Sequence, residues 1–150
     1  MRLEDAIQQG KFSSEKEKLM VNILFTSKWF GYMHNDILKT FGMTQEQYNV
    51  LRILRGQKGN PIGVNDISSR MIDKMSNTSR IIDKLVNKGL ADRKPCPKDR
   101  RAVDVIITNK GMDLLSEMDP IHKDMISQLT SISTNEAREL NSLLDKLRSN

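Results

Sequence analysis

Apolar residues recur every three or four positions along most of the chain, which is the spacing of one face of an α-helix. The stretches with this spacing cover about residues 14–39, 44–56, 109–132 and 133–147. A short apolar segment follows Pro61, and another helical segment runs from Ser76 to just before Gly89. The pattern therefore predicts a mainly helical protein.

Three of these helices begin with the signature of a capping box. In this motif a Ser or Thr and a Glu or Gln three residues later each bind the other's backbone N–H. The pairs are Ser14 with Glu17, Thr44 with Gln47, and Ser133 with Glu136. We expect helices to begin directly after residues 14, 44 and 133. Pro120 lies inside the stretch over 109–132 and is expected to bend that helix or mark an irregular point.

Two strand-like runs, "LADRKPC" and "RAVDVIIT", separate the helices of the middle from those of the end. The second run alternates Val103, Val105 and Ile107 with other residues, which is the period of a strand. The polar residues "PKDRR" between the runs indicate the tip of a two-stranded hairpin. The expected order is helix, helix, short helix, helix, hairpin, helix, helix.

A short helix, a turn, a second helix with a small polar face and a basic hairpin together make up a winged helix-turn-helix. The predicted fold class is therefore mainly α, with α+β character. We expect a single domain over 1–150, in which about 44–111 form a winged-helix DNA-binding lobe. The flanking segments, about 12–40 and 109–150, are expected to be dimerisation helices, because their apolar stripes exceed what a small lobe can cover.

Positive charge is concentrated in one segment of the chain. The whole chain carries +5, whereas the window from Arg70 to Arg101 holds ten basic and four acidic residues, a net charge of +6. A polyanion is the natural partner for such a surface, and double-stranded DNA fits better than a membrane because no basic amphipathic helix with bulky anchors accompanies it. The alternative is that these basic residues form a surface that only contacts solvent.

The helix that begins at Ser76 has one face suited to contact a nucleic acid. On a helical wheel Ser76, Asn77, Arg80 and Lys84 fall within one arc with Asp83 and Asn87, and Thr78, Ile81, Ile82 and Leu85 lie opposite. Hydroxyl, amide and guanidinium groups pair with base edges in the major groove or with phosphates.

The segments "TSRIIDKLVNKGLADR" and "DRRAVDVIITNKG" resemble the recognition helix and wing of the MarR family of bacterial transcription regulators. The resemblance implies a homodimer whose terminal helices interlock, with one wing and one recognition helix per subunit on a pseudo-palindromic operator. It places Ser76, Asn77 and Arg80 toward the groove, Lys84 near phosphate and Arg101 at the wing. Asp99 is expected to hold Arg101 in one orientation. The candidate DNA contacts are Ser76, Asn77, Thr78, Arg80, Lys84, Lys98, Asp99, Arg100 and Arg101.

The resemblance also implies a small phenolic or aromatic effector, for which Trp29, Tyr32, Met33 and His34 are the candidate binding residues. His34 and the chain's other histidine, His122, lie on mainly apolar helices and are better explained as core residues than as ligands. Cys96 suggests a redox switch, but it lies in the hairpin rather than near the N-terminal helix where the family's sensor cysteines are expected. We interpret it as an ordinary strand residue.

Other classes of protein find little support in the residues. The motifs G-x-S-x-G, H-E-x-x-H, G-x-G-x-x-G and the P-loop are absent, so we expect no enzyme and no cofactor. One cysteine and two distant histidines provide no metal motif and no disulfide. Without an apolar leader or an apolar run of about 18 residues, we expect a cytoplasmic protein.

The favoured function is a homodimeric repressor, which a small ligand releases from its operator. Repressor and activator remain alternatives, because both place the same domain on DNA. The rival from another class is a helical protein-interaction module whose basic surface is incidental.

Overall fold

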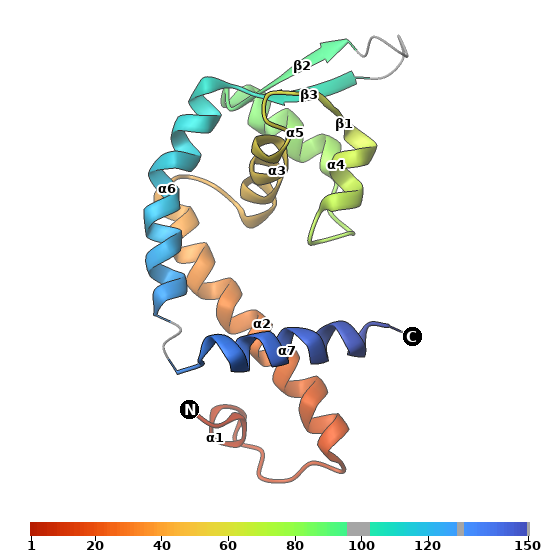
Figure 1. Cartoon of the computed structure of the whole chain (residues 1–150), viewed down its shortest axis with the longest axis vertical. Coiled ribbons are helices and arrows are strands. Elements are labelled where there is room, and N and C mark those ends of the chain that lie inside the picture. Colours follow the sequence, from red (N-terminus) through yellow and green to blue (C-terminus); the bar gives the residue numbers. More distant parts are fainter. Residues whose placement is uncertain (96–102, 129–130, 150) are drawn as a thin grey trace. The chain divides into compact units, whose positions relative to one another are not determined.

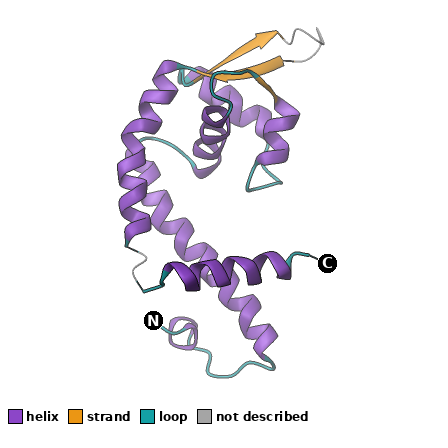
Figure 2. Ribbon diagram, in the orientation of Figure 1, coloured by secondary structure: helices purple, strands orange, loops and turns teal. Residues whose placement is uncertain are grey.

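The computed structural model describes residues 1–95, 103–128 and 131–149. Figure 2 shows that helices dominate these ranges, with one small sheet. The elements are α1 (Leu3–Ile7), α2 (Glu15–Thr40), α3 (Gln45–Gly56), β1 (Ile62–Gly63), α4 (Val64–Arg70), α5 (Thr78–Asn87), β2 (Ala91–Pro95), β3 (Val103–Ile107), α6 (Asn109–Ser127) and α7 (Thr134–Leu147). The predicted fold class, mainly helical with a winged helix-turn-helix, is confirmed.

The chain divides into two compact units, Met1–Gly111 and Met112–Asn150. The first holds the elements from α1 to β3 and the beginning of α6. The second holds the rest of α6 and α7. The assignment of residues 1–150 to one domain, with a lobe over about 44–111, stays a prediction.

Two of the three expected capping boxes are complete. Thr44 and Ser133 each accept the backbone N–H three residues ahead, and the side chains of Gln47 and Glu136 bind back to the N-cap N–H. Ser14 caps α2 in the same way, but the carboxylate of Glu17 accepts from Ser13 instead. The predicted helix starts after residues 14, 44 and 133 are thus confirmed. At the first of them the Glu17 side chain binds Ser13 instead of the N-cap N–H.

The sheet has a strand that the sequence did not predict. Its order is β1-β3-β2, all antiparallel, with Ile62 opposite Val105 and Arg93 also opposite Val105 on the other side. The expected two-stranded hairpin is therefore only part of a three-stranded sheet. β1 has two residues and follows Pro61, so it is too short to show any alternation. α1 was missed for the same reason.

The core of the first unit lies where α3, α4 and α5 pack together beneath the sheet (Figure 1). Its fully buried side chains are Val50, Leu51, Leu54, Ile67, Ile82, Leu85 and Val105. They come from one face of each helix and the inner face of β3, as their spacing predicts. Burying each such side chain stabilises the lobe by about 1.5–3 kcal/mol. α5 is thus held rigidly by its apolar face.

The connection from α5 to β2 is a tight turn at Gly89. The Leu90 N–H donates to the Leu85 carbonyl at 2.9 Å, and Gly89 has φ +70°, a left-handed conformation that favours glycine. The Thr108 hydroxyl donates to the Gly89 carbonyl at 2.7 Å. The end of the helix, the start of β2 and the end of β3 are therefore joined at one point.

Gly111 is required by the close approach of α6 to this turn. A Cβ at position 111 would stand 2.3 Å from the Leu90 carbonyl oxygen and 2.8 Å from Ile107 Cγ1. Because one of these neighbours is backbone, we expect Gly111→Ala to destabilise the protein by about 1–3 kcal/mol. Gly56→Ala is the matched control, since nothing lies within 4 Å of its added Cβ. Urea unfolding that shows equal stability for the two variants would contradict this prediction.

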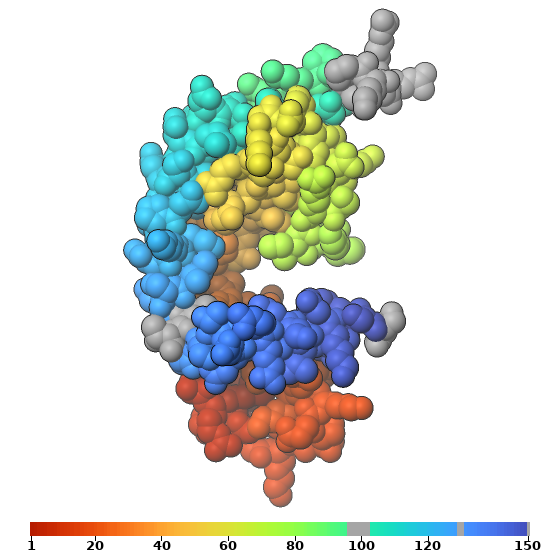
Figure 3. All heavy atoms as spheres, in the orientation of Figure 1, coloured from red at the N-terminus to blue at the C-terminus, as the bar shows by residue number. Residues whose placement is uncertain are grey.

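In the second unit α6 runs without a break through Pro120, and the expected bend or irregular point there stays a prediction. α7 has no buried residue. Its leucines Leu140, Leu143 and Leu147 are 46–56% exposed, and α7 is drawn in blue in Figure 3.

Candidate nucleic-acid interface

The helix expected to read DNA, α5, begins later than the wheel assumed. Asn77 is its N-cap, and the Asn77 side-chain oxygen accepts the backbone N–H of Arg80 at 3.1 Å. Ser76 therefore precedes the helix. The placement of Ser76 and Asn77 inside the helix was wrong, because an asparagine side chain favours the capping position over the helix interior.

The outer face of α5 carries mostly polar side chains. The exposed residues are Ser79, Arg80, Asp83, Lys84 and Asn87. Arg80 and Lys84 are four positions apart, so their charges project from the same side of the helix. The sequence-based arc is thus confirmed for its helical members. Ser79 was not among the candidates, although its exposure next to Arg80 gives it the same access to a ligand.

Thr78 does not lie on this face. Its side chain is 5% exposed, and its hydroxyl oxygen has no hydrogen-bond partner within the part of the chain that the structure describes. It points into the core on the side of Ile82 and Leu85. Its inclusion among the DNA contacts disagrees with this placement, and the helical wheel had already put it opposite Arg80.

Ser76 is held by the turn that precedes α5. Its hydroxyl donates to Asp73 Oδ2 at 2.8 Å, and the Met75 N–H donates to Asp73 Oδ1 at 2.9 Å. These two hydrogen bonds, first that of Met75 and then that of Ser76, hold the pKa of the Asp73 carboxyl below its ordinary value. The Ile72 N–H donates to the Asn49 side chain of α3 at 2.9 Å. The turn is therefore fixed before any ligand arrives.

Among the described residues of the basic window, Lys74, Lys88 and Arg93 each have a partner within the protein, and Lys74 Nζ donates to the Ser69 carbonyl at 2.5 Å. Lys88 Nζ donates to the Gly42 carbonyl at 2.6 Å and to Gln47 Oε1 at 3.0 Å, so it links the end of α5 to the start of α3. The Arg93 guanidinium of β2 forms an ion pair with Asp83 of α5. These exposed cations therefore also connect elements of the lobe.

The wing is formed by β2 and β3, which pair from Ala91 opposite Ile107 to Pro95 opposite Val103. Arg93 and Lys94 are exposed on β2. The predicted wing contacts Lys98, Asp99, Arg100 and Arg101 lie outside the described residues, as does Cys96. Their roles stay predictions from the sequence.

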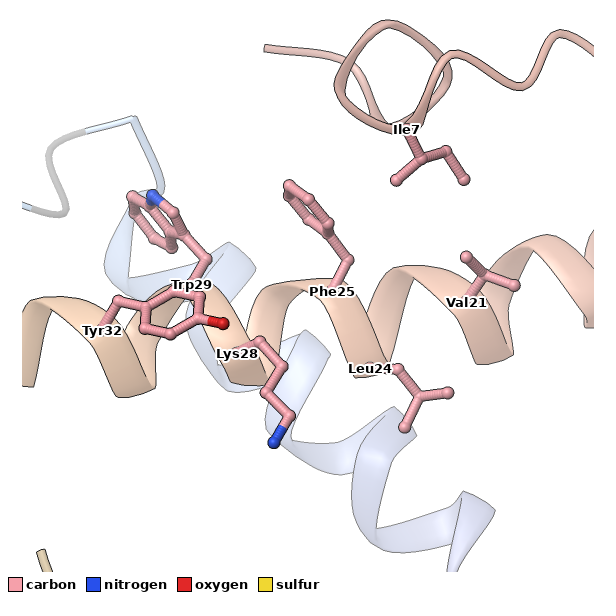
Figure 4. Close-up of a pocket in the computed structure, with 7 residues that line it drawn as sticks. All are labelled: Ile7, Val21, Leu24, Phe25, Lys28, Trp29 and Tyr32. Carbon is pink, nitrogen blue, oxygen red and sulfur yellow. The ribbon is translucent and has the colours of Figure 1, made fainter.

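A groove of about 460 Å³ lies between α1 and α2 (Figure 4). Its lining residues are Ile7, Val21, Leu24, Phe25, Lys28, Trp29 and Tyr32. In Figure 4 Val21 and Phe25 point from α2 toward α1, and Lys28 and Tyr32 contribute the polar groups. The groove thus combines aromatic rings with one cation and one hydroxyl.

Two of the four predicted ligand residues, Trp29 and Tyr32, line this groove. His34 does not. Its ring lies edge-on to that of Tyr48, with the ring centroids 5.2 Å apart, so it faces α3. Met33 is half-buried and does not line the groove either. The structure therefore places Trp29 and Tyr32 apart from His34.

Among the described residues no three His, Cys, Asp or Glu side chains are close enough to hold a metal ion. Across the same residues, none of the helices is both long and apolar enough to cross a membrane.

Comparison with known proteins agrees with this geometry. A family model described as "MarR family" matches residues 43–103, which run from the end of α2 into β3. The transcriptional repressor MprA of Escherichia coli (strain K12) is 30% identical over 116 residues, 77% of this chain and 66% of that protein. The chain thus spans just under two thirds of the length of MprA.

The uncharacterised HTH-type transcriptional regulator YkoM of Bacillus subtilis (strain 168) is 34% identical over 111 residues, covering 72% of this chain and 70% of that protein. Among solved structures, a mutant MarR from E. coli complexed with operator DNA has a TM-score of 0.79 at 24% identity. That alignment covers 92% of this chain and 99% of the other. At this identity the likeness concerns the fold.

Proposed function

Because the chain belongs to the MarR family, we propose that it is a DNA-binding transcriptional regulator, a homodimer that reads a pseudo-palindromic operator. The observation that carries the proposal is the outer face of α5, where Arg80 and Lys84 project from a helix whose other face is buried in the lobe. A helix fixed in this way can enter the major groove, which is about 12 Å wide.

The side chains of α5 have different roles in this proposal. Arg80 donates two hydrogen bonds to a guanine O6 and N7, the commonest base-specific contact. Lys84, one turn further along, binds a phosphate. Asn77 keeps its amide NH₂ for DNA, since only its oxygen is used as the helix cap. Ser76 contributes through its place in the turn rather than through a freely rotating hydroxyl.

The wing supplies the second set of contacts. We propose that Lys98, Arg100 and Arg101 approach the minor groove beside the recognition helix, attracted by its negative potential. Asp99 does not contact DNA in this scheme. It is close enough in sequence to share a strand face with Arg101 and hold its guanidinium.

The terminal helices supply the dimer. Leu140, Leu143 and Leu147 of α7 and Met20 of α2 are 46–58% exposed, more apolar surface than a monomer usually leaves open. A second copy of the chain is the natural cover, because a two-fold interface matches two half-sites of an operator.

A duplex from the region upstream of this chain's own gene tests the proposal. Fluorescence anisotropy should show tighter binding to this duplex than to a shuffled duplex of equal composition. Affinity for both should fall steeply as salt rises, because phosphate contacts release counterions. A protein-interaction module with an incidental basic surface would show neither the preference nor tight binding at low salt.

We further propose that the regulator is a repressor, which is what the name of its relative MprA states for that protein. Release by a small aromatic acid or phenol fits the groove between α1 and α2, whose rings can stack on an aromatic ligand while Lys28 pairs with its negative charge. A reporter gene behind the upstream region should be silent with the protein and active with the effector. Activation of the reporter gene by the protein alone would mean that the regulator is an activator instead.

Trp29 makes this groove directly observable, because it is the only tryptophan of the chain. We expect its fluorescence to change on titration with benzoate or phenol. Lys28→Ala should weaken benzoate about tenfold but leave neutral phenol nearly unchanged, because only the carboxylate needs a cation. Lys16→Ala, an exposed lysine outside the lining, is the matched control. A Trp29 signal that stays flat up to millimolar ligand would exclude the groove as the effector site.

A further inference from the structure

The ion pair between Asp83 and Arg93 joins the recognition helix to the wing. Asp83 lies on the exposed face of α5 between Arg80 and Lys84, and Arg93 lies in the middle of β2. The two residues are ten positions apart, on either side of the turn at Gly89. α5 and β2 are joined at the Gly89 turn, and the ion pair therefore adds a second link across the angle between them.

Stability does not explain this pair. The side chains of Asp83 and Arg93 are 55% and 42% exposed, and exposed ion pairs contribute little to folding. The backbone hydrogen bonds at Gly89 already connect α5 to β2. Ala91 and Val105 anchor the inner part of the hairpin in the core, so what remains for the ion pair to fix is the angle of its outer part, where residues 92–95 of β2 are exposed.

That angle matters because the hairpin acts as a lever. Pro95, at the outer end of β2, is four residues beyond the buried Ala91, which in a strand is about 13 Å. A rotation of roughly 10° over this length would move that end by about 2 Å. A displacement of this size exceeds the tolerance of a hydrogen bond to DNA.

The charge of Asp83 points to the same role. A carboxylate on the face that approaches DNA repels phosphates, so an acid there needs a compensating benefit. We propose that Asp83 is a positioning residue for operator binding: it holds Arg93, which fixes the hairpin at the angle that lets wing and recognition helix engage one half-site together. This inference rests on the proposed DNA-binding function.

The sign of one substitution separates positioning from simple charge. If Asp83 only repels phosphates, Asp83→Asn should tighten binding to every duplex, most of all at low salt. If it positions the wing, Asp83→Asn should weaken the operator about tenfold while binding to a shuffled duplex stays equal or tightens slightly.

The experiment measures operator and shuffled-duplex affinity at two salt concentrations for the full chain and its variants. Asp83→Asn, Arg93→Gln and the double variant form a cycle. Because the two residues act together, removing Asp83 should change operator affinity far less once Arg93 is gone. Asp83→Glu, which keeps the carboxylate, should restore most of the preference for the operator.

Asp92→Asn is the matched control, because Asp92 is an exposed acid of β2 with no ion-pair partner among the described residues. It makes the same charge change without breaking the link and should leave the ratio of operator to shuffled binding unchanged. Equal thermal unfolding of Asp83→Asn and wild type will show that the lobe is intact.

Tighter operator binding by Asp83→Asn, or additive effects in the cycle, would overturn the positioning role. A wild-type protein that does not prefer its operator would instead overturn the proposed function. The two failures are therefore distinguishable in one set of titrations.

Discussion

Replacing Leu140 and Leu143 of α7 by aspartate is expected to convert the dimer into a monomer and to abolish tight operator binding. Both side chains are about half exposed in the single chain, so the new charges should not disturb its own core. In the proposed dimer they would be buried without partners, which association cannot tolerate. Losing one of two linked half-site contacts should lower operator affinity by about a hundredfold or more.

Sedimentation velocity at micromolar concentration and anisotropy on the operator measure the two effects. The control is Asn141→Asp with Ser142→Asp, which adds the same charge to exposed residues on the other side of α7. This control should stay dimeric and keep its operator affinity. A wild-type protein that sediments as a monomer would refute the proposed assembly.

Arg80→Ala is expected to have the second largest effect, on sequence preference. Loss of a base contact costs about 1–3 kcal/mol per half-site. Over the two half-sites of a dimer, operator affinity should fall roughly thirtyfold to ten-thousandfold. Affinity for a shuffled duplex should fall much less, because in the wild type Arg80 contributes only a general electrostatic attraction to that duplex.

Lys84→Ala provides the comparison, since it removes one positive charge from the same face of α5. If Lys84 binds phosphate, operator and shuffled duplex should weaken alike, and the salt slope should flatten by about one unit per subunit. Equal losses on the two duplexes for Arg80→Ala as well would remove the distinction between base reading and phosphate binding.

The local signals in the sequence predicted helix starts well, because a capping box depends on two side chains and the backbone between them. Thr44 with Gln47 and Ser133 with Glu136 form as expected. Ser14 also caps its helix, but Glu17 had a second hydroxyl, that of Ser13, within reach. A signature of four residues cannot decide between two such neighbours.

The start of α5 shows where periodicity fails. A helical wheel assigns an angle to every residue whether or not it is helical, so Ser76 and Asn77 were given places on a face that begins only at Thr78. Asp73 bonding to the Ser76 hydroxyl and to the Met75 N–H stabilises a turn there instead. Local hydrogen bonds of this kind compete with helix formation, and they leave no periodic pattern in the sequence.

Contacts between elements were harder to predict than the elements. The partner of Asp83 is ten residues away across a turn, and that of Lys88 lies more than forty residues earlier in the chain. Such pairings depend on how helices and strands pack in three dimensions. The groove shows the same limit, because its α1 side comes from a five-residue helix with no sequence period of its own.

The order of the three strands also affects how readily the protein aggregates at high concentration. β3 is paired on both edges, so within the described residues β1 and β2 are the edge strands, and β2 is the longer of the two. An open edge invites pairing with another chain, which is how many β-aggregates begin. Along β2 that edge carries Asp92, Arg93 and Lys94 and then reaches Pro95, which has no N–H to donate. The same charged strand proposed to guide the wing onto DNA therefore also discourages edge-to-edge aggregation.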